Sequence, residues 1–465
     1  MSSQSNIQPP TAIQIGSNGV YFIGIGGIGM SALARYFNAL KIPVSGYDRT
    51  ATVLTQQLES EGIAIHYEEN ISLIPKKIDV VVYTPAIPKD HAELVYYQQN
   101  GYTVVKRSDV LQWISANSFN VCIAGTHGKT TTTSMTAHIL RHSGYGCNAF
   151  LGGIAANYNT NFWSSNNNVV VVEADEYDRS FLKLTPDVAI ITAMDADHLD
   201  IYGTAEAVET AFLQFSDKVK KGGCLIAKYG MARQAEFTTD TVTTYSLSNT
   251  NAHVHATNIV VENGSYRFNV VGRGWTIDNV MLHMGGLHNI ENAVAAIAVA
   301  KFLNIEEDKI VAALDAFKGV KRRFEYHLKT DTHVLIDDYA HHPEELRALI
   351  SGVRSIFPHK KLTLLFQPHL YSRTNDLAND FATSLDLADE VVLLPIYPAR
   401  ELPIEGVDSE MLLRKMKLTN KQVLSKQATL AWIATRKPEL VVMAGAGDID
   451  GLIEECKNNL LHNHS

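Results

Sequence analysis

Short runs rich in apolar and β-branched residues recur along the chain and restrict its fold more than any other sequence feature. Polar stretches able to form a helix separate each run from the next. Strands that are apolar on both faces must be buried on both faces, which is the condition of a parallel sheet covered by helices. The sequence therefore predicts an α/β protein. The runs form three series: residues 20–24, 44–48, 80–84 and 103–107; residues 121–124, 169–172 and 188–192; and residues 333–336, 362–366, 391–395 and 440–444.

The chain length supports a division into three domains, one for each series. At about 150 residues per domain, 465 residues correspond to about three. In the middle segment a β-rich stretch, residues 241–284, follows the buried strands, and two helical patterns end the segment. We place the domains at residues 1–112, 113–320 and 321–465, and expect a mostly parallel sheet in the middle one.

Composition excludes several classes of function. The chain has 40 Lys and Arg against 49 Asp and Glu, a net charge of −9, which would repel a phosphate backbone, so we expect no nucleic-acid partner. Its longest apolar stretch, residues 293–300, is far shorter than the roughly 20 residues of a membrane span. The N-terminus lacks a signal-peptide pattern, and the four cysteines show no CxxC spacing. We expect a cytoplasmic protein with reduced cysteines, either a monomer or a weak homodimer.

A glycine loop follows the first apolar run. Gly24, Gly26 and Gly29 form the pattern G-x-G-x-x-G, and Asp48 ends the next run 19 residues beyond Gly29. This spacing is typical of dinucleotide sites, where a diphosphate approaches the backbone at a helix N-terminus. Three alternatives remain: a tight turn without a ligand, an NAD(P) site and a nucleotide-sugar site. No acid or base suited to hydride transfer is identifiable, which favours the nucleotide sugar over NAD(P).

A phosphate loop follows the run at residues 121–124 and is the strongest motif in the chain. Its sequence, GTHGKTT, lacks the first glycine of the longer phosphate-loop pattern, because Ile123 stands there. In such loops backbone N–H groups surround the phosphates, a lysine reaches the β and γ oxygens, and a threonine hydroxyl binds Mg²⁺. The residues concerned are Gly125, Thr126, His127, Gly128, Lys129, Thr130 and Thr131.

Two further strand ends supply candidate metal ligands. The run at residues 169–172 leads into Glu173-Ala174-Asp175-Glu176, and a carboxylate beside a phosphate loop is placed to hold Mg²⁺. The run at residues 188–192 leads into an acidic segment that contains His198, a candidate second ligand. The alternatives are a solvated acidic loop and a structural histidine.

Taken together, the motifs resemble the Mur ligases, ATP-dependent enzymes that form amides in peptidoglycan precursor synthesis. The resemblance covers essentially the whole chain. Its motifs, in family order, are GTHGKT, EADE, DADHLD followed by Tyr202-Gly203, HNIEN at residues 288–292, RRFE at 322–325, DDYAHHP at 337–343 and QPHLYSRT at 367–374. Within the family, the glycine-loop sequence favours the member that adds L-alanine to UDP-N-acetylmuramate over the recycling ligase that attaches a tripeptide to the same nucleotide sugar.

The resemblance implies an enzyme with three domains: a Rossmann-like N-terminal domain for the UDP-sugar, a central P-loop ATPase and a Rossmann-like C-terminal domain for the amino acid. It implies ATP and two Mg²⁺ ions as cofactors, and UDP-N-acetylmuramate and L-alanine as substrates. An acyl phosphate would form from the sugar carboxylate and ATP, and the third domain would close to exclude water.

The resemblance also assigns residues to roles. It implies catalytic roles for Lys129, Glu173, His198, Arg323 and His342; ATP contacts for residues 125–131, Asn289, Asn292, Arg323 and Asp338; UDP-sugar contacts for Gly26, Gly27, Ile28, Gly29, Met30, Asp48, Thr84 and Arg107; amino-acid contacts for Tyr339, His342, His369 and Arg373; and Mg²⁺ ligation by Thr130, Glu173 and His198. The base that deprotonates the amine is either His198 or His342.

The chain departs from the family pattern at two positions. Leu370 stands where many members have arginine, and Asn375 also replaces a frequent arginine. A leucine cannot pair with a carboxylate, so Arg373 or a neighbour must carry the amino-acid carboxylate. Two other functions stay open at this point: a ligand-gated binding protein without turnover, and an NAD-linked oxidoreductase, in which the phosphate loop would have no role.

Overall fold

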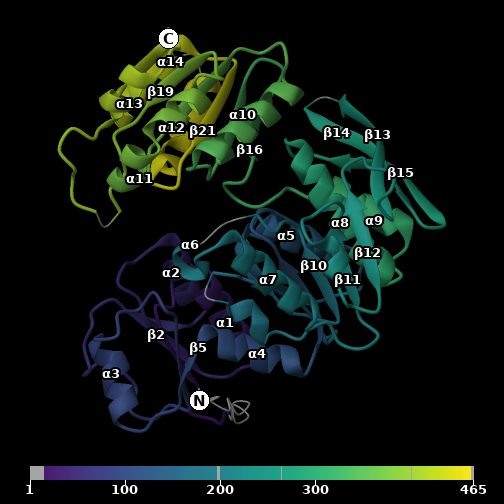
Figure 1. Cartoon of the computed structure of the whole chain (residues 1–465). Helices are drawn as coiled ribbons and strands as arrows, with labels where there is room; N and C mark the ends of the chain where they lie inside the picture. The colour runs from purple at the N-terminus through teal and green to yellow at the C-terminus, as the bar shows by residue number, and fades with distance from the viewer. Residues whose placement is uncertain (1–14, 178, 196–198, 263, 400, 462–465) are drawn as a thin grey trace. The chain divides into compact units, whose positions relative to one another are not determined.

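The computed structural model of the chain describes residues 15–177, 179–195, 199–262, 264–399 and 401–461 (Figure 1). Three β-sheets with helices between their strands confirm the predicted α/β class. By its internal contacts the chain forms two compact units. The first unit comprises residues 1–255, 272–274 and 292–313, and the second comprises residues 256–271, 275–291 and 314–465. Each unit is described by itself.

The first sheet is parallel and has the strand order β3-β2-β1-β4-β5. The order reverses at β1, and such a reversal opens a crevice at the carboxyl ends of the strands where ligands bind. The glycine loop begins there, directly after β1. The elements are β1 (Val20–Ile23), α1 (Ile28–Ala39), β2 (Val44–Tyr47), α2 (Val53–Ser60), β3 (Ala64–His66), β4 (Val80–Tyr83), α3 (Ala92–Gln99), β5 (Val104–Lys106) and α4 (Arg107–Ala116).

The second sheet has ten strands in the order β15-β14-β13-β12-β11-β10-β6-β9-β7-β8. Strands β6, β7 and β9 to β13 pair in parallel with their neighbours among this set. Strand β8 runs antiparallel to β7. The elements are β6 (Phe119–Ala124), α5 (Lys129–His142), β7 (Asn148–Ala155), β8 (Thr160–Trp163), β9 (Val169–Glu173), η1 (Ser180–Lys183), β10 (Val188–Ile191), α6 (Leu199–Tyr202), α7 (Ala205–Ser216), β11 (Cys224–Lys228), η2 (Gln234–Glu236), β12 (Val242–Ser246), β13 (Val254–Glu262), β14 (Ser265–Gly272), β15 (Trp275–Leu282), α8 (Leu287–Phe302) and α9 (Glu307–Asp315).

The third sheet has the order β16-β17-β21-β18-β19-β20 and is parallel except for β16. Strands β17, β18 and β21 are buried almost throughout, as the apolar runs predicted. The elements are β16 (Glu325–Lys329), β17 (Val334–Asp338), α10 (Pro343–Ile356), β18 (Leu362–Phe366), α11 (Tyr371–Asp376), α12 (Ala378–Leu385), β19 (Glu390–Leu393), α13 (Ser409–Lys415), β20 (Lys421–Val423), α14 (Lys426–Arg436), β21 (Leu440–Ala444), η3 (Ile449–Leu452) and α15 (Ile453–Leu461).

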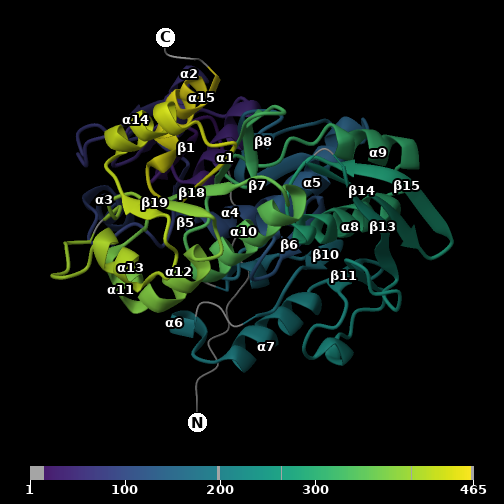
Figure 2. The same ribbon diagram turned by 90° about the horizontal axis from the view of Figure 1, so that it is seen from above.

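Within the first unit, α1 packs against β7 and β8 (Figure 2). Tyr36 of α1 contacts the rings of Phe150 and Phe162, with centroid distances of 5.4 and 6.0 Å. On the same helix Arg35 is only 6% exposed; it forms an ion pair with Glu61 and donates a short hydrogen bond to the side-chain oxygen of Asn161. The helix that follows the glycine loop is therefore fixed against the edge of the second sheet by both apolar and polar contacts.

Two composition-based expectations can be compared with the structure. All four cysteines are buried, and none forms a disulfide. Among the described residues, no helix is both long enough and apolar enough to cross a membrane.

We predict that Asn161→Ala destabilises the protein. Asn161 is fully buried, and its Nδ2 donates to the Ile28 carbonyl at 2.5 Å and to Ser31 Oγ at 2.9 Å. Truncation would also leave the Arg35 guanidinium without one buried acceptor. We expect a loss of about 2–3 kcal/mol in the free energy of unfolding, measured by urea denaturation. The exposed Asn100→Ala is the control, with a loss below about 0.5 kcal/mol. Equal stability of the two variants would contradict the role given to Asn161.

Candidate active site

The phosphate loop joins β6 to α5, and its backbone requires glycine at two positions. Gly125 has φ +135° and Gly128 has φ +82°, conformations that other residues rarely adopt. A Cβ atom at Gly125 would lie 2.0 Å from Thr192 Oγ1, and one at Gly128 would lie 2.8 Å from Asn292 Oδ1. Helix α5 begins at Lys129, so its free N–H groups and positive dipole end face the loop. This local geometry suits a polyphosphate.

Two carboxylates, one at the end of β9 and one in the loop that follows it, contact consecutive residues at the start of α5. Lys129 Nζ donates to Glu176 Oε1 at 2.7 Å and to the Gly125 carbonyl at 2.7 Å. Thr130 Oγ1 donates to Glu173 Oε1 at 3.2 Å. Burial raises the pKa of Glu176, and the neighbouring Lys129 opposes this shift. The sequence pattern gave no reason to separate Glu176 from the other acidic residues of its run, so its contact with Lys129 was not predicted.

The oxygen atoms of Thr130 and Glu173 fit the ligand chemistry of Mg²⁺, which prefers hydroxyl and carboxylate oxygens. The space around the Glu173 carboxylate depends on Gly152 of β7, because a Cβ there would lie 2.0 Å from Glu173 Oε2. The predicted third ligand, His198, and its neighbours at 196 and 197 lie outside the described residues. Asp195, just before them, donates its backbone N–H to Thr126 Oγ1 at 3.2 Å.

A cavity of about 290 Å³ in the first unit brings the glycine loop and Glu173 together. Its walls come from the glycine loop, α1, α4 and the residue after β4, and from β7, β9 and the loop after β9. Six of the residues expected to bind the UDP-sugar line it, together with Glu173 and Asp175. The lining includes Gly27, Ile28, Gly29, Met30, Thr84, Arg107, Phe150, Gly152, Glu173 and Asp175. A ligand whose diphosphate lies on the glycine loop could thus present another group to Glu173.

Asp48 and Arg107 approach the glycine loop from either side. Asp48 Oδ2 accepts a hydrogen bond from the Gly26 backbone at 2.8 Å, and a Cβ on Gly26 would lie equally close to that oxygen. Arg107 lies against Gly29, where a Cβ would be 2.9 Å from its Nη1, and forms an ion pair with Asp175 at 3.6 Å. The glycines at 26 and 29 are therefore required for close approach of these side chains.

The two asparagines of the HNIEN motif are both nearly buried. Asn292, 7% exposed, lies against Gly128 of the phosphate loop. Asn289, 4% exposed, donates its Nδ2 to the Gly285 carbonyl at 2.6 Å. Within the first unit, Asn292 is therefore the asparagine of this motif that lies beside the phosphate loop.

In the second unit, several of the predicted amino-acid contacts gather around His369. Arg373 Nη1 lies 3.4 Å from His369 Nδ1, and the His341 ring lies between those of His369 and Tyr339, at 6.1 and 5.3 Å. Burial lowers the pKa of His341 and of His369, with a further contribution from Arg373 to both. His341 had no predicted role, because the motif alone did not distinguish it from its neighbour.

His342 and Leu370 each lie directly before a helix of the second unit. His342 is exposed and forms the N-cap of α10, where its backbone N–H donates to Glu345 Oε2 at 3.0 Å. Leu370 precedes α11 with φ 72°, and its N–H donates to the Tyr397 carbonyl at 2.9 Å. Because the Leu370 backbone has a positive φ, the turn before α11 determines the direction of its side chain.

Asp338 and Arg323 adjoin the turn that leads into the third sheet. The half-buried Asp338 accepts hydrogen bonds from the backbone N–H groups of Phe324 at 2.7 Å and Ala340 at 2.8 Å. Burial raises its pKa to about 6 in spite of these bonds. Arg323 donates its backbone N–H to the Val320 carbonyl at 3.1 Å. In the described structure Asp338 therefore organises the turn that carries Arg323.

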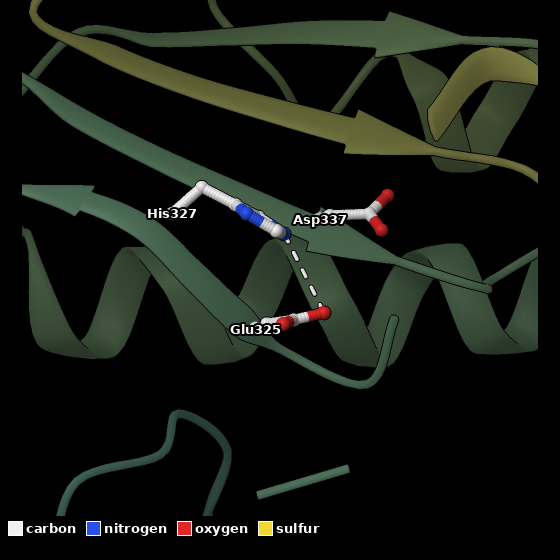
Figure 3. Close-up of side chains that lie close together, drawn as sticks. All are labelled: Glu325, His327 and Asp337. Atoms are coloured by element: carbon white, nitrogen blue, oxygen red, sulfur yellow. Dashed lines mark ion pairs between the residues drawn. The ribbon is translucent and has the colours of Figure 1, made fainter. Parts of the chain in front are cut away.

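A separate group of possible metal ligands lies on β16 and β17. Glu325, His327 and Asp337 place three possible ligand atoms within 4.8 Å of one another, with His327 and Glu325 paired at 3.4 Å (Figure 3). However, the Arg322 guanidinium lies 3.4 Å from Asp337, and it also donates to the Gly445 carbonyl. Because a histidine faces one carboxylate and an arginine faces the other, we interpret the cluster as structural contacts at the start of the third sheet and not as a metal site.

Comparison with known proteins gives a consistent result along the chain. Family profiles described as "Mur ligase family, catalytic domain", "Mur ligase middle domain" and "Mur ligase, glutamate ligase domain" match residues 19–119, 123–300 and 322–447. The UDP-N-acetylmuramate–L-alanine ligase of Cytophaga hutchinsonii is 48% identical over 447 residues, 94% of this chain and 96% of the relative. The enzyme of the same name from Christiangramia forsetii is 48% identical over 449 residues, 95% and 97% of the two chains.

Solved structures agree with the sequence relatives. The UDP-N-acetylmuramate–alanine ligase MurC of Thermotoga maritima superposes with a TM-score of 0.79 at 28% identity, over 95% of this chain and 98% of that one. A murein peptide ligase from Psychrobacter arcticus gives a TM-score of 0.66 at 22% identity, over 96% and 99% of the chains. At that identity the second match supports the fold alone.

We predict that Gly152→Ala impairs binding of magnesium–nucleotide complexes. The new Cβ would displace the Glu173 carboxylate from its place beside Thr130. We expect affinity for Mg–ATP, measured by calorimetry, to fall by about tenfold or more. The control is Gly451→Ala, where a Cβ meets no atom within 4 Å. Unchanged Mg–ATP affinity in Gly152→Ala would contradict the placement of the metal at Glu173.

We also predict that Asp337→Asn reduces the pH dependence of stability. Burial raises the pKa of Asp337 from 3.8 to about 7, although Arg322 and His327 oppose this and Asp338 and Asp450 add to it. A carboxyl with a raised folded-state pKa holds its proton more tightly when folded, so its stabilising effect is present below about pH 4 and is lost as the pH rises to about 7. Asparagine cannot ionise and avoids this loss.

The measurement is thermal denaturation of parent and variant at about pH 5 and about pH 8. Relative to the parent, Asp337→Asn should gain on the order of 2 kcal/mol between the two pH values. The exposed Asp376→Asn is the control and should show the parent's profile. A variant as sensitive to pH as the parent would mean that Asp337 is ionised in the folded protein throughout this range.

Proposed function

The chain belongs to the Mur ligase family, and from this premise we propose that it joins L-alanine to the carboxylate of UDP-N-acetylmuramate with cleavage of ATP. Two curated relatives of nearly full length carry this activity in their names. The observation that carries the proposal is the cavity in which the glycine loop faces Glu173, beside the phosphate loop. An NAD-linked oxidoreductase would leave Lys129, Thr130 and their carboxylate partners without a function.

The reaction requires activation of a carboxylate in the presence of another anion. An oxygen of the sugar carboxylate attacks the γ-phosphorus, the bond to the β-γ bridging oxygen breaks, and ADP leaves. The alanine amine, in its neutral form, then attacks the acyl carbonyl, inorganic phosphate leaves with its electron pair, and the nitrogen gives up a proton to a base, for which His198 and His342 are the candidates. Both partners of the first step are anionic, so the barrier falls mainly through charge neutralisation and alignment. Lys129 neutralises phosphate oxygens, and α5 presents its N-terminal N–H groups to them.

We assign Mg²⁺ to Thr130 and Glu173, where it would supply further neutralisation of the triphosphate, and a second ion to His198. The three functional domains are proposed at residues 1–112, 113–320 and 321–465. The contacts are divided as the family resemblance implies: the UDP-sugar with Gly26 to Met30, Asp48, Thr84 and Arg107; ATP with residues 125–131, Asn289, Asn292, Arg323 and Asp338; and alanine with Tyr339, His342, His369 and Arg373.

One observation favours the neighbourhood of His369 for the amino acid. Arg373 Nη1 lies 3.4 Å from His369 Nδ1, and burial lowers the pKa of His369 and of His341, which favours their neutral forms and leaves Arg373 as the cation for the alanine carboxylate. Arg373 can therefore take the place of the arginine that is absent at position 370.

The test of the proposed function is release of ADP and phosphate with UDP-N-acetylmuramate, with and without L-alanine, glycine or L-serine. Release that requires both the sugar nucleotide and an amino acid supports ligation, with L-alanine the preferred amine. Binding of ATP without cleavage under every combination would instead support a ligand-gated binding protein. Trapping with hydroxylamine tests the acyl phosphate, and amide formation without any trapped hydroxamate would contradict that step.

We predict that Lys129→Ala abolishes ATP cleavage while UDP-N-acetylmuramate still binds. The lysine lies on the phosphate loop and does not line the cavity beside the glycine loop. Turnover should fall by about 10²-fold or more, by analogy with loss of one preorganised donor. Calorimetry with the UDP-sugar should give a dissociation constant within about threefold of the parent, which corresponds to less than about 0.7 kcal/mol. Parallel loss of both properties would refute the separation of the two sites.

A further inference from the structure

Glu176 has no role in the reaction described so far, although it makes the strongest side-chain contact of the phosphate loop. Its Oε1 accepts a hydrogen bond from Lys129 Nζ at 2.7 Å. The Glu176 side chain is 1% exposed and that of Lys129 is 15% exposed, so water screens the pair poorly. Charge-assisted hydrogen bonds of this length are about twice as strong as neutral ones. The nucleotide must therefore compete with a protein carboxylate for the lysine.

The backbone of Glu176 is fixed independently of Lys129. Tyr202 donates its hydroxyl hydrogen to the Glu176 carbonyl at 2.6 Å, and the Arg179 backbone N–H donates to the same oxygen at 2.9 Å. Tyr202 is itself only 6% exposed, and the Arg179 guanidinium lies 4.8 Å from the centre of its ring. Because these contacts anchor the loop, the carboxylate cannot follow the lysine far when the lysine turns toward a phosphate.

The second donor contact of Lys129 limits where its ammonium can go. Nζ also donates to the Gly125 carbonyl at 2.7 Å, which keeps the side chain extended over the loop. Glu176 and Gly125 thus hold the ammonium group from two directions, with one N–H left for a phosphate oxygen. To contact both the β and the γ oxygens, Lys129 must break its hydrogen bond with Glu176. A hydrogen bond to one phosphate oxygen does not require this.

We propose that Glu176 is a positioning residue that holds Lys129 over the phosphate loop and competes with the bound nucleotide for it, so that both nucleotides bind more weakly than they would without the carboxylate, ATP by at least as much as ADP. A triphosphate offers both β and γ oxygens and draws the lysine away from Glu176. ADP offers only the β-phosphate after transfer, and the carboxylate recovers the lysine. The pair would therefore assist release of ADP after each turnover. This inference rests on the proposed function, since it takes ATP as the ligand of the loop.

The test compares Glu176→Gln with the parent in the full-length protein. Glutamine preserves the length of the side chain and an oxygen that can accept from Lys129, but it removes the charge. We expect the KM for ATP to fall by about threefold or more, and the inhibition constant for ADP to fall by no more than the same factor, because the nucleotide no longer competes with a charged partner for Lys129. The KM for the UDP-sugar should not change. A role confined to folding would not tighten the binding of nucleotides to the loop.

Two further variants complete the experiment. Glu206→Gln, at an exposed position in the first turn of α7, makes the same chemical change as a control and should leave both nucleotide constants at the parent values. Glu176→Asp withdraws the carboxylate from its 2.7 Å contact and should lower the KM for ATP by about twofold, which also serves if the glutamine variant does not fold. A KM for ATP equal to or above the parent's in the folded Glu176 variant would overturn the inference. Failure of the parent to bind ATP would instead overturn the proposed function.

Discussion

The carboxyl ends of neighbouring parallel strands meet at one edge of a sheet, and the phosphate site depends on this constraint. β6 lies between β9 and β10, so the loops that follow these strands converge. The loop after β6 leads into α5, which begins with Lys129 and Thr130. Their carboxylate partners are Glu173 at the end of β9 and Glu176 in the loop that follows it. Without the parallel register, residues more than forty positions apart would not form two consecutive pairs.

Packing within the first unit then places this phosphate site beside a second ligand-binding loop. Helix α1 follows the glycine loop and packs on β7 and β8, the strands beyond β9 in the same sheet. Asn161 and Arg35 satisfy each other at this buried contact, which restricts how α1 can rotate or slide. The cavity that joins the glycine loop to Glu173 is a consequence of that packing. Stability and substrate alignment thus depend on the same buried contacts.

Two cations of the site are each paired with a carboxylate, and an anionic ligand can replace that carboxylate as the cation's partner. Lys129 faces Glu176, Arg107 faces Asp175, and each cation also lies beside a loop suited to phosphate. In the second unit the Arg322 guanidinium lies 3.4 Å from the buried Asp337 of β17 and also donates to the carbonyls of Gly445 and Gly447. Paired cations avoid the cost of isolated buried charge and remain available to an anionic substrate.

The sequence by itself determined the α/β class, the three series of strands and the two glycine-rich loops, because each depends on local patterns of apolar residues and on glycines with unusual backbone angles. It also placed Lys129 and Thr130 in a phosphate loop, whereas the structure has α5 begin at Lys129. Only the tertiary structure decided which carboxylate of the run at 173–176 contacts which residue, and that His341 lies between Tyr339 and His369. Those contacts depend on strand register and on burial by distant segments, and no spacing along the chain encodes either.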